Sequence, residues 1–208
     1  MDWQQRYDTG DTPWDLRGVT PPLEALLASG RLRELGVPDR ADVAVPGCGR
    51  GHDLRAFANL GHAVTGFDIA PGVVLEARRL LALNLVRGAQ VHCRDVLGLS
   101  GEFAQRFDLV YDYTCFCALT PYLRAAYARE VAAILRDRGV FLALAFPMPP
   151  FTGRADGGAG PPHLVRREDL FAAFEADHEF LADFDAEHSA PSRAGFERWF
   201  AFRRRPRA

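Results

Sequence analysis

The sequence contains no lysine, and all 25 of its basic residues are arginine. A Schiff base on a lysine side chain and a phosphate-binding loop that ends in lysine are therefore excluded. The formal net charge of -2 at pH 7 provides no excess of positive charge, so we expect neither nucleic acid nor a membrane as a partner. We expect the arginine-rich tail, residues 203–207, to be solvated.

Cysteine and long apolar runs are also scarce. The four cysteines, Cys48, Cys93, Cys115 and Cys117, form no Cys-x-x-Cys pair and have no partners at metal-ligand spacing. We therefore expect reduced thiols and no metal site, with Cys115 and Cys117 buried behind the fourth strand. The longest apolar runs, such as "VFLALAF", are too short to cross a membrane, and the polar, aromatic N-terminus does not have the pattern of a signal peptide. The expectation is a soluble, cytoplasmic protein.

Short apolar strands alternate with amphipathic helices along the chain. Hydrophobic residues make up 48% of the sequence, which suits one domain over residues 1–208. Five strands are expected at 42–46, 62–70, 89–96, 107–113 and 139–146, followed by two closing strands at 178–184 and 196–203. Strands that alternate with helices predict an α/β fold in which a parallel sheet is covered on both faces.

The helices between these strands have recognisable starts. Asp53 is the expected N-cap of a helix that ends at Gly61, and prolines open two others. The expected helices are 21–35, 53–61, one from Pro71 that buries Val74, Ala77, Leu81 and Leu85, one from Thr120–Pro121 that buries Tyr127, Val131 and Leu135, and 164–176.

Residues 147–162, "PMPPFTGRADGGAGPP", interrupt this alternation. Five prolines and four glycines in this segment exclude regular structure. A loop of this length in a compact domain is either a functional lid or a disordered insertion. We favour a lid, because the loop follows the fifth strand at the sheet edge where ligands bind in α/β folds.

The segment "VPGCGRGHD" places three glycines, at 47, 49 and 51, directly after the first expected strand. Glycine allows a sharp turn and lets a ligand approach the main chain, so Gly47, Cys48 and Gly49 are candidate contacts. Asp68 ends the second strand, where a carboxylate can accept hydrogen bonds from both hydroxyls of a ribose. Together these features predict a nucleoside pocket. A tight turn with an incidental aspartate is the alternative.

Further acids distinguish between nucleoside cofactors. The spacing G-x-G-x-G is tighter than the dinucleotide pattern G-x-G-x-x-G, and no later helix offers a second pyrophosphate site. Asp95 follows the third strand near the adenine position, and Asp112 lies in the fourth strand. A cationic sulfonium without phosphates suits a pocket rimmed by three acids better than a pyrophosphate does. The expected cofactor is therefore S-adenosylmethionine rather than NAD.

The segments "WQQRYDTGDTPWD", "VPGCGRGHD", "VTGFDIAP", "FDLVYDYTCFCAL" and "GPPHLV" follow one another along the chain. Together they resemble the thiopurine, thiol and halide methyltransferase family, and most closely its plant-type branch and bacterial relatives. The resemblance extends from about Trp3 to Trp199. It implies a Rossmann-like class I methyltransferase fold with a seven-stranded, mostly parallel sheet. It also implies a monomer that methylates a thiol, bisulfide, thiocyanate, halide or thiopurine.

By this resemblance, residues 1–20 form an aromatic segment that covers the cofactor. Trp3, Tyr7 and Trp14 are its expected contacts. Tyr7 stands where many relatives have tryptophan, and either ring can face a sulfonium. The other cofactor-binding residues that the resemblance implies are Gly47, Asp68, Ile69, Asp95, Val96, Asp112 and Arg124.

Two residues are candidates for catalysis. The resemblance places Tyr113 beside the methionine end of the cofactor and the acceptor. His163, in "GPPHLV", stands where plant-type relatives have tyrosine, and it could orient an acceptor or accept a thiol proton near neutral pH. A solvated loop histidine is the alternative.

Methyl transfer from a sulfonium is an in-line displacement that depends on alignment and on exclusion of water rather than on a strong base. The expected activity is therefore transfer of a methyl group from S-adenosylmethionine to a small soft nucleophile. Two alternatives stay open. One is a methyltransferase of the same fold that acts on oxygen, nitrogen or a metalloid, and the other is a cofactor-binding module without turnover. An NAD-dependent oxidoreductase is a more distant alternative.

Overall fold

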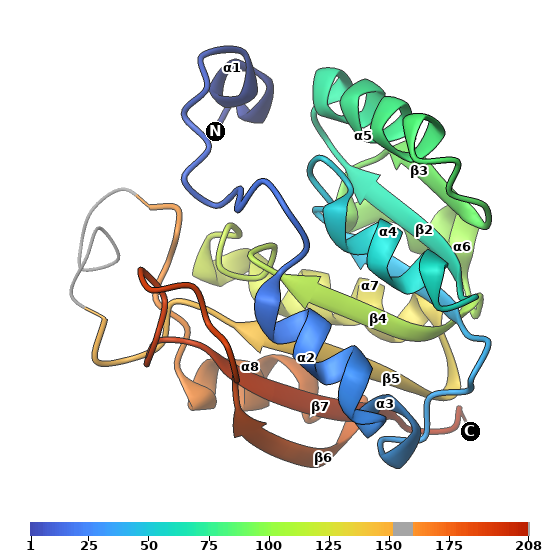
Figure 1. Cartoon of the computed structure of the whole chain (residues 1–208). Helices are drawn as coiled ribbons and strands as arrows, with labels where there is room; N and C mark the ends of the chain where they lie inside the picture. Colours follow the sequence, from blue (N-terminus) through green and yellow to red (C-terminus); the bar gives the residue numbers. More distant parts are fainter. Residues whose placement is uncertain (152–159, 208) are drawn as a thin grey trace.

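The computed structural model describes residues 1–151 and 160–207, and a β-sheet runs through the centre of this part of the chain (Figure 1). Its strands are β1 (Asp42–Pro46), β2 (Ala63–Asp68), β3 (Ala89–Cys93), β4 (Phe107–Tyr113), β5 (Leu135–Ala145), β6 (His178–Asp185) and β7 (Arg198–Arg204). These seven strands lie in the order β3-β2-β1-β4-β5-β7-β6. β1 to β5 are parallel, whereas β7 is antiparallel to β5 and β6. The predicted seven-stranded, mostly parallel sheet is confirmed.

Helices cover both faces of the sheet (Figure 1). One face packs against α2 (Pro21–Ser29), α4 (His52–Asn59) and α5 (Pro71–Leu83), and the other packs against α6 (Ser100–Phe103), α7 (Arg124–Ile134) and α8 (Arg167–Phe174). The remaining helical elements are α1 (Trp3–Asp8), which contacts α5, and α3 (Arg31–Glu34), η1 (Val96–Gly98) and η2 (Pro121–Leu123). Within the described ranges, no helix combines the length and apolar character needed to cross a bilayer.

The central strands bury side chains on both faces, because successive residues of a strand point to opposite sides of the sheet. In β5, Val140, Leu142 and Leu144 belong to the core on the α2, α4 and α5 side. Phe141 belongs to the opposite core and stacks on Phe174 of α8, with ring centroids 4.1 Å apart. These two apolar layers explain why β5 is a nearly continuous hydrophobic run in the sequence.

The prediction that Asp53 caps a helix is wrong. α4 begins at His52, and the residue before it, Gly51, has a left-handed conformation with φ of 81°. The Asp53 carboxylate instead accepts hydrogen bonds from the backbone N–H and the hydroxyl of Thr20, both at 2.8 Å, and from the hydroxyl of Tyr111 at 3.1 Å. A tertiary contact has taken the place of the local cap, and it fixes the start of α2 against α4.

Two expected helices also differ in their bounds. The helix expected over 21–35 is broken at Gly30, because the φ of 75° at this residue is incompatible with a right-handed helix. The helix expected from Pro71 ends at Leu83, so Leu85 is 85% exposed rather than buried.

Three further boundaries lie a few residues from their expected positions. The third strand ends at Cys93 rather than at residue 96, because the Asp95 carboxylate accepts the Leu97 N–H and begins η1. The segment from Thr120–Pro121 starts as the short turn η2 before α7 begins. The fifth strand begins at Leu135, which therefore lies in the sheet and not on the preceding helix.

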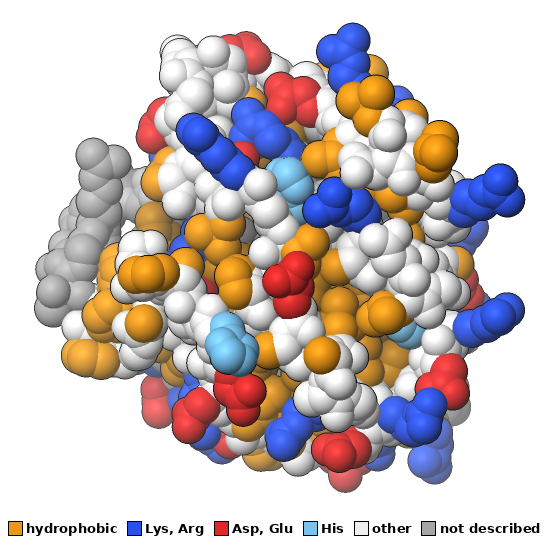
Figure 2. Space-filling model, viewed as in Figure 1, with side chains coloured by type: hydrophobic (Ala, Val, Ile, Leu, Met, Phe, Trp, Pro, Cys, Tyr) orange, Lys and Arg blue, Asp and Glu red, His pale blue; other side chains and the backbone are white. Residues whose placement is uncertain are grey.

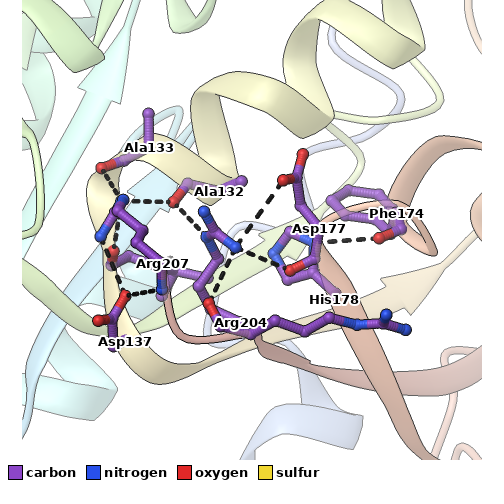
Figure 3. A network of polar contacts seen from close by, with 10 residues as sticks. Ala132, Ala133, Asp137, Phe174, Asp177, His178, Arg204 and Arg207 are labelled. Carbon is purple, nitrogen blue, oxygen red and sulfur yellow. Dashed lines mark hydrogen bonds and ion pairs between the residues drawn. The ribbon is translucent and has the colours of Figure 1, made fainter.

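The arginines near the C-terminus bind the protein's own main chain (Figure 3). Arg204 donates to the carbonyl oxygen of Ala132 at 3.0 Å, and Arg207 donates to Ala132 at 3.1 Å and to Ala133 at 3.2 Å. The last carbonyls of a helix lack helical partners and carry partial negative charge, so guanidinium groups are well suited to the end of α7. Arg204 and Arg207 are therefore not the freely solvated side chains that we expect from the sequence, whereas Arg205 is exposed. Figure 2 shows that basic and acidic side chains are interspersed on the face that it presents.

His178, at the start of β6, makes stability depend on pH. The side chain is fully buried, with Nδ1 3.2 Å from the carbonyl oxygen of Phe174 (Figure 3), and burial lowers the pKa of its imidazole to about 4. Below pH 6.5 the unfolded chain binds a proton that the folded protein does not, so acid destabilises the folded protein. We predict that the stability advantage of wild type over His178→Gln shrinks by about 2 kcal/mol between pH 7 and pH 4.5.

Urea unfolding of both proteins at the two pH values checks this prediction. Carboxylates such as Asp112 titrate in both proteins and cancel in the difference. His188→Asn, which replaces an exposed histidine, is the control and should show a difference from wild type that does not change with pH. A pH-independent difference for His178→Gln would contradict the prediction.

Candidate functional site

The carboxyl ends of the parallel strands meet at one edge of the sheet, and a cavity of about 570 Å³ lies there. Its walls are residues at or after the ends of β1 to β5, the loop between β6 and β7, and the N-terminal segment, which we define as residues 1–15. β1 and β4 are neighbours at the centre of the sheet, where the strand order reverses. In open α/β sheets, ligands bind in the crevice at the carboxyl ends of the strands where the strand order reverses. The volume of the cavity is that of a small-molecule site.

Eight of the predicted site residues come together in this cavity, although they lie on four separate parts of the chain. They are Trp3, Tyr7, Trp14, Gly47, Asp68, Ile69, Asp95 and Val96. A smaller neighbouring cavity of about 70 Å³ is lined by three others, Cys48, Gly49 and Tyr113.

The glycine turn leaves the main chain bare because it has no room for side chains. Gly47 has φ of 62°, and a Cβ placed on it would lie 3.1 Å from the Cβ of Cys115. Gly49 has φ of 52°, and a Cβ there would lie 3.2 Å from the hydroxyl oxygen of Tyr7. Both the backbone conformation and the close neighbours therefore require glycine.

Asp68 joins the turn to the second strand. One carboxylate oxygen accepts the backbone N–H of Gly49 and the other accepts that of Ala70, each at 3.0 Å. Burial raises the pKa of Asp68, while these hydrogen bonds oppose the shift. A carboxylate oxygen can accept more than one hydrogen bond, so Asp68 can still receive hydroxyl groups of a ligand in the cavity.

The aromatic residues of the N-terminal segment pack as one unit. Trp14 lies edge-to-face with both Trp3 and Tyr7, with ring centroids 5.4 Å and 5.6 Å apart, and its indole N–H donates to the Tyr7 hydroxyl at 3.2 Å. Tyr7 also packs against Ala70 and Val73, so the unit is attached to the start of α5. These rings form an aromatic wall of the cavity.

Asp112 lies outside the residues that line the cavity, and its side chain is buried. It accepts a hydrogen bond from the Tyr127 hydroxyl at 2.6 Å and another from the Phe116 N–H at 3.2 Å. Burial raises the pKa of Asp112 to about 6. These contacts fix the chain just after β4, which supplies the cavity wall at Thr114 and Cys115.

Arg124 and His163 lie together beside the cavity and are absent from its described lining. Arg124 donates to the carbonyl oxygen of Leu164 at 3.0 Å and pairs with Asp169 at 3.2 Å. The backbone N–H of His163 donates to the carbonyl of Cys117 at 2.8 Å. Burial and the nearby Arg124 lower the pKa of the His163 imidazole. The predicted roles of both residues stay predictions.

Arg193 is a cavity residue that the sequence does not single out. It lies between β6 and β7, in a loop without a motif, and only the fold brings it to the cavity beside Phe146. Cys115 and Cys117 are buried, as expected, but both also line the cavity. Within the described residues, no group of three metal-ligating side chains is present.

The geometry of the turn predicts a larger cost of alanine at Gly47 than at another left-handed glycine. Gly61 has φ of 88° and nothing within 4 Å of the Cβ position, so Gly61→Ala should lose only about 1 kcal/mol from backbone strain. Gly47→Ala adds the collision with Cys115 and should lose about 2–4 kcal/mol. The free energy of unfolding in urea measures both variants. Equal losses would show that the turn has room for a side chain.

A family model described as thiopurine S-methyltransferase (TPMT) matches residues 1–201. A probable thiol methyltransferase 2 from Arabidopsis thaliana is 32% identical over 164 residues, which cover 78% of this chain and 66% of that protein. The chain thus spans just under two thirds of that relative's length. A thiopurine S-methyltransferase from Xanthomonas axonopodis pv. citri is 27% identical over 188 residues, which cover 84% of this chain and 81% of that protein.

A solved structure with the same fold is the 1,6-didemethyltoxoflavin-N1-methyltransferase from Burkholderia thailandensis, which contains its substrate and S-adenosylhomocysteine. It aligns with a TM-score of 0.72 and 21% identity over 99% of this chain and 86% of that chain. This similarity confirms the expected Rossmann-like methyltransferase fold. Because the family model covers nearly the whole sequence, the chain belongs to the thiopurine S-methyltransferase family.

Proposed function

We propose that the protein is an S-adenosylmethionine-dependent methyltransferase that transfers a methyl group to a small soft nucleophile, in particular a sulfur acceptor. The observation that carries the proposal is the Asp68 carboxylate at the cavity, held against the bare main chain of the glycine turn. Membership of the family supports it, as do relatives named thiol, thiocyanate and thiopurine methyltransferases. A neighbour of the same fold was solved with S-adenosylhomocysteine.

The described residues fit this cofactor. Asp68 has lone pairs left for the two ribose hydroxyls after accepting its backbone N–H groups. Ile69, Asp95 and Val96 line the same cavity and would hold the adenine. The aromatic rings of the N-terminal segment are suited to a cationic sulfonium, because the face of an aromatic ring attracts positive charge.

When bound, S-adenosylmethionine supplies a methyl group that its sulfonium activates for displacement. The protein aligns the acceptor with this group and keeps water out. Leu119, Leu123 and Phe146 line part of the cavity without any polar side-chain atom. We assign the acceptor to this apolar part.

The two cavity thiols do not compete with the acceptor. Burial raises the pKa of both Cys115 and Cys117, with nearby Asp112 as a further cause. The thiolate is the reactive form of cysteine, so protonated thiols are poor nucleophiles. The cavity can therefore hold a methyl donor beside its own sulfur atoms.

We also propose that halides are among the acceptors, that the protein is cytoplasmic and monomeric, and that it is a single domain in which residues 147–162 form a lid. Phe151, Pro161 and Pro162, near the two ends of that loop, line the cavity and support the lid. Residues 152–159 lie outside the described residues.

Loss of the Asp68 carboxylate should weaken cofactor binding. Hydrogen bonds to a charged group contribute about 1.5–3 kcal/mol each, and Asp68 would accept two from the ribose, so Asp68→Ala should raise the Kd for S-adenosylhomocysteine at least about 100-fold. Calorimetric titration measures this Kd. Asp39→Ala is the control, because Asp39 is exposed and pairs with Arg33 on the surface. Wild-type affinity in Asp68→Ala, or no binding to the wild type, would contradict the proposal.

His163 should matter only for acceptors that lose a proton. The lowered pKa keeps its imidazole neutral at pH 7, where it can accept a proton from a thiol, whereas thiocyanate and iodide carry none. We predict that His163→Ala lowers kcat for an alkyl thiol, which is protonated at pH 7, at least about tenfold and leaves kcat for the two anions unchanged.

Labelled S-adenosylmethionine with an alkyl thiol, thiophenol, bisulfide, thiocyanate, iodide and a thiopurine provides the assay. Equal effects of His163→Ala on thiols and anions would remove its role as a base. Cofactor binding without a methylated product from any acceptor would instead indicate a binding module without turnover.

A further inference from the structure

Arg193 connects two walls of the cavity that are far apart in the sequence. Its Nη2 donates to the carbonyl oxygen of Trp14 at 2.8 Å and to that of Pro13 at 3.4 Å. Among the described residues, these are the only hydrogen bonds that join residues 1–15 to the chain beyond residue 100. The other attachments of the N-terminal segment lie on the glycine-turn side of the cavity.

Those other attachments hold the beginning and the end of the segment. The backbone N–H of Gly72, in α5, donates to the Gln4 side chain at 2.7 Å. Asp15 pairs with Arg50, which lies in the glycine turn between Gly49 and Gly51, at 2.5 Å. Both contacts fix the segment to the half of the protein that carries Asp68. Arg193 alone ties it to the loop before β7.

The Arg193 guanidinium is itself held in place by buried residues on the side away from the N-terminal segment. Its Nη1 donates to the Tyr113 hydroxyl, which donates to the Glu197 carboxylate at 2.5 Å. Its plane also lies over the rings of Tyr113 and Phe146, at 5.0 Å and 4.9 Å from their centroids. Arg193 and Glu197 are both nearly inaccessible to solvent, so each compensates the buried charge of the other.

We propose that Arg193 is a positioning residue that latches the N-terminal segment across the cavity and so holds the aromatic wall against the bound cofactor. The inference rests on the proposed function, since it concerns the same cavity. Arg193 does not take part in the displacement itself. It acts through the carbonyls of Pro13 and Trp14, and thereby sets where the Trp14 ring stands and how long the cofactor stays.

The geometry favours arginine over lysine at this position. A guanidinium is a planar fork that can donate to two carbonyls and to a hydroxyl at once while stacking on aromatic rings. A lysine ammonium keeps the charge opposite Glu197 but lacks the fork. Arg193→Lys should therefore recover only part of the latch, and Arg193→Met should recover none.

The tryptophans of the chain provide the readout. Trp3 and Trp14 are half-buried in the N-terminal segment, whereas Trp199, the third, is 1% exposed in β7. Acrylamide should therefore quench the fluorescence of Trp3 and Trp14 but not that of Trp199. Saturating S-adenosylhomocysteine should protect Trp3 and Trp14 in the wild type. Arg193→Met should lose most of this protection and release the ligand at least about tenfold faster, and Arg193→Lys should fall between the two.

The control is Arg198→Met, which removes an arginine from a surface ion pair on β7 and should behave as wild type. An unquenched Trp199 and a cooperative unfolding transition report that each variant is folded, although Arg193→Met should unfold at a lower urea concentration because it leaves the buried Glu197 without its partner. If the wild type binds S-adenosylhomocysteine but Arg193→Met releases it at the wild-type rate with full protection, the latch is overturned. If the wild type does not bind it, the proposed function fails instead.

Discussion

The hydrogen bond from the Gly49 N–H to the Asp68 carboxylate, at 3.0 Å, is the constraint on which the site depends. It joins the turn after β1 to the end of β2, so the glycine turn and the Asp68 carboxylate cannot move independently. The main chain of the turn also lies close to Tyr7, because a Cβ at position 49 would be 3.2 Å from the Tyr7 hydroxyl oxygen. The same glycine that exposes the main chain thus also fixes where the aromatic wall begins.

The site is completed by contacts between distant parts of the sequence. The N-terminal segment belongs to neither helical layer, and it is held at the glycine turn, at α5 and at the loop before β7. Each attachment uses a charged or polar side chain, against main chain for Gln4 and Arg193 and against a partly exposed arginine for Asp15. Such contacts tie the segment down without requiring it to join the core, which is the property a cofactor cover needs if it is to open and close.

Features that depend on residues close together in the sequence could be predicted, whereas features that depend on distant residues could not. Strands, the glycine turn and Asp68 are set by patterns within about 25 residues, and the structure contains them where the pattern predicts. Asp53 was open to a local interpretation as a helix cap, but Thr20 and Tyr111 compete for its carboxylate and are invisible to a local pattern. Arg193 has no signature at all, because its importance comes only from the carbonyls that the fold brings to it.

The buried acids at and near the cavity determine which charge a ligand should carry. Burial raises the pKa of Asp68 and of Asp112, which means that the free protein holds these negative charges at a cost. A cation bound nearby would reduce that cost, whereas a pyrophosphate would increase it. The buried pair of Arg193 and Glu197 is neutral as a unit and leaves this preference unchanged. The buried negative charge of the two acids therefore favours binding of a sulfonium, and the same charge is costly when no cation is bound. Asp68 contributes part of this charge and also the hydrogen bonds to the ribose.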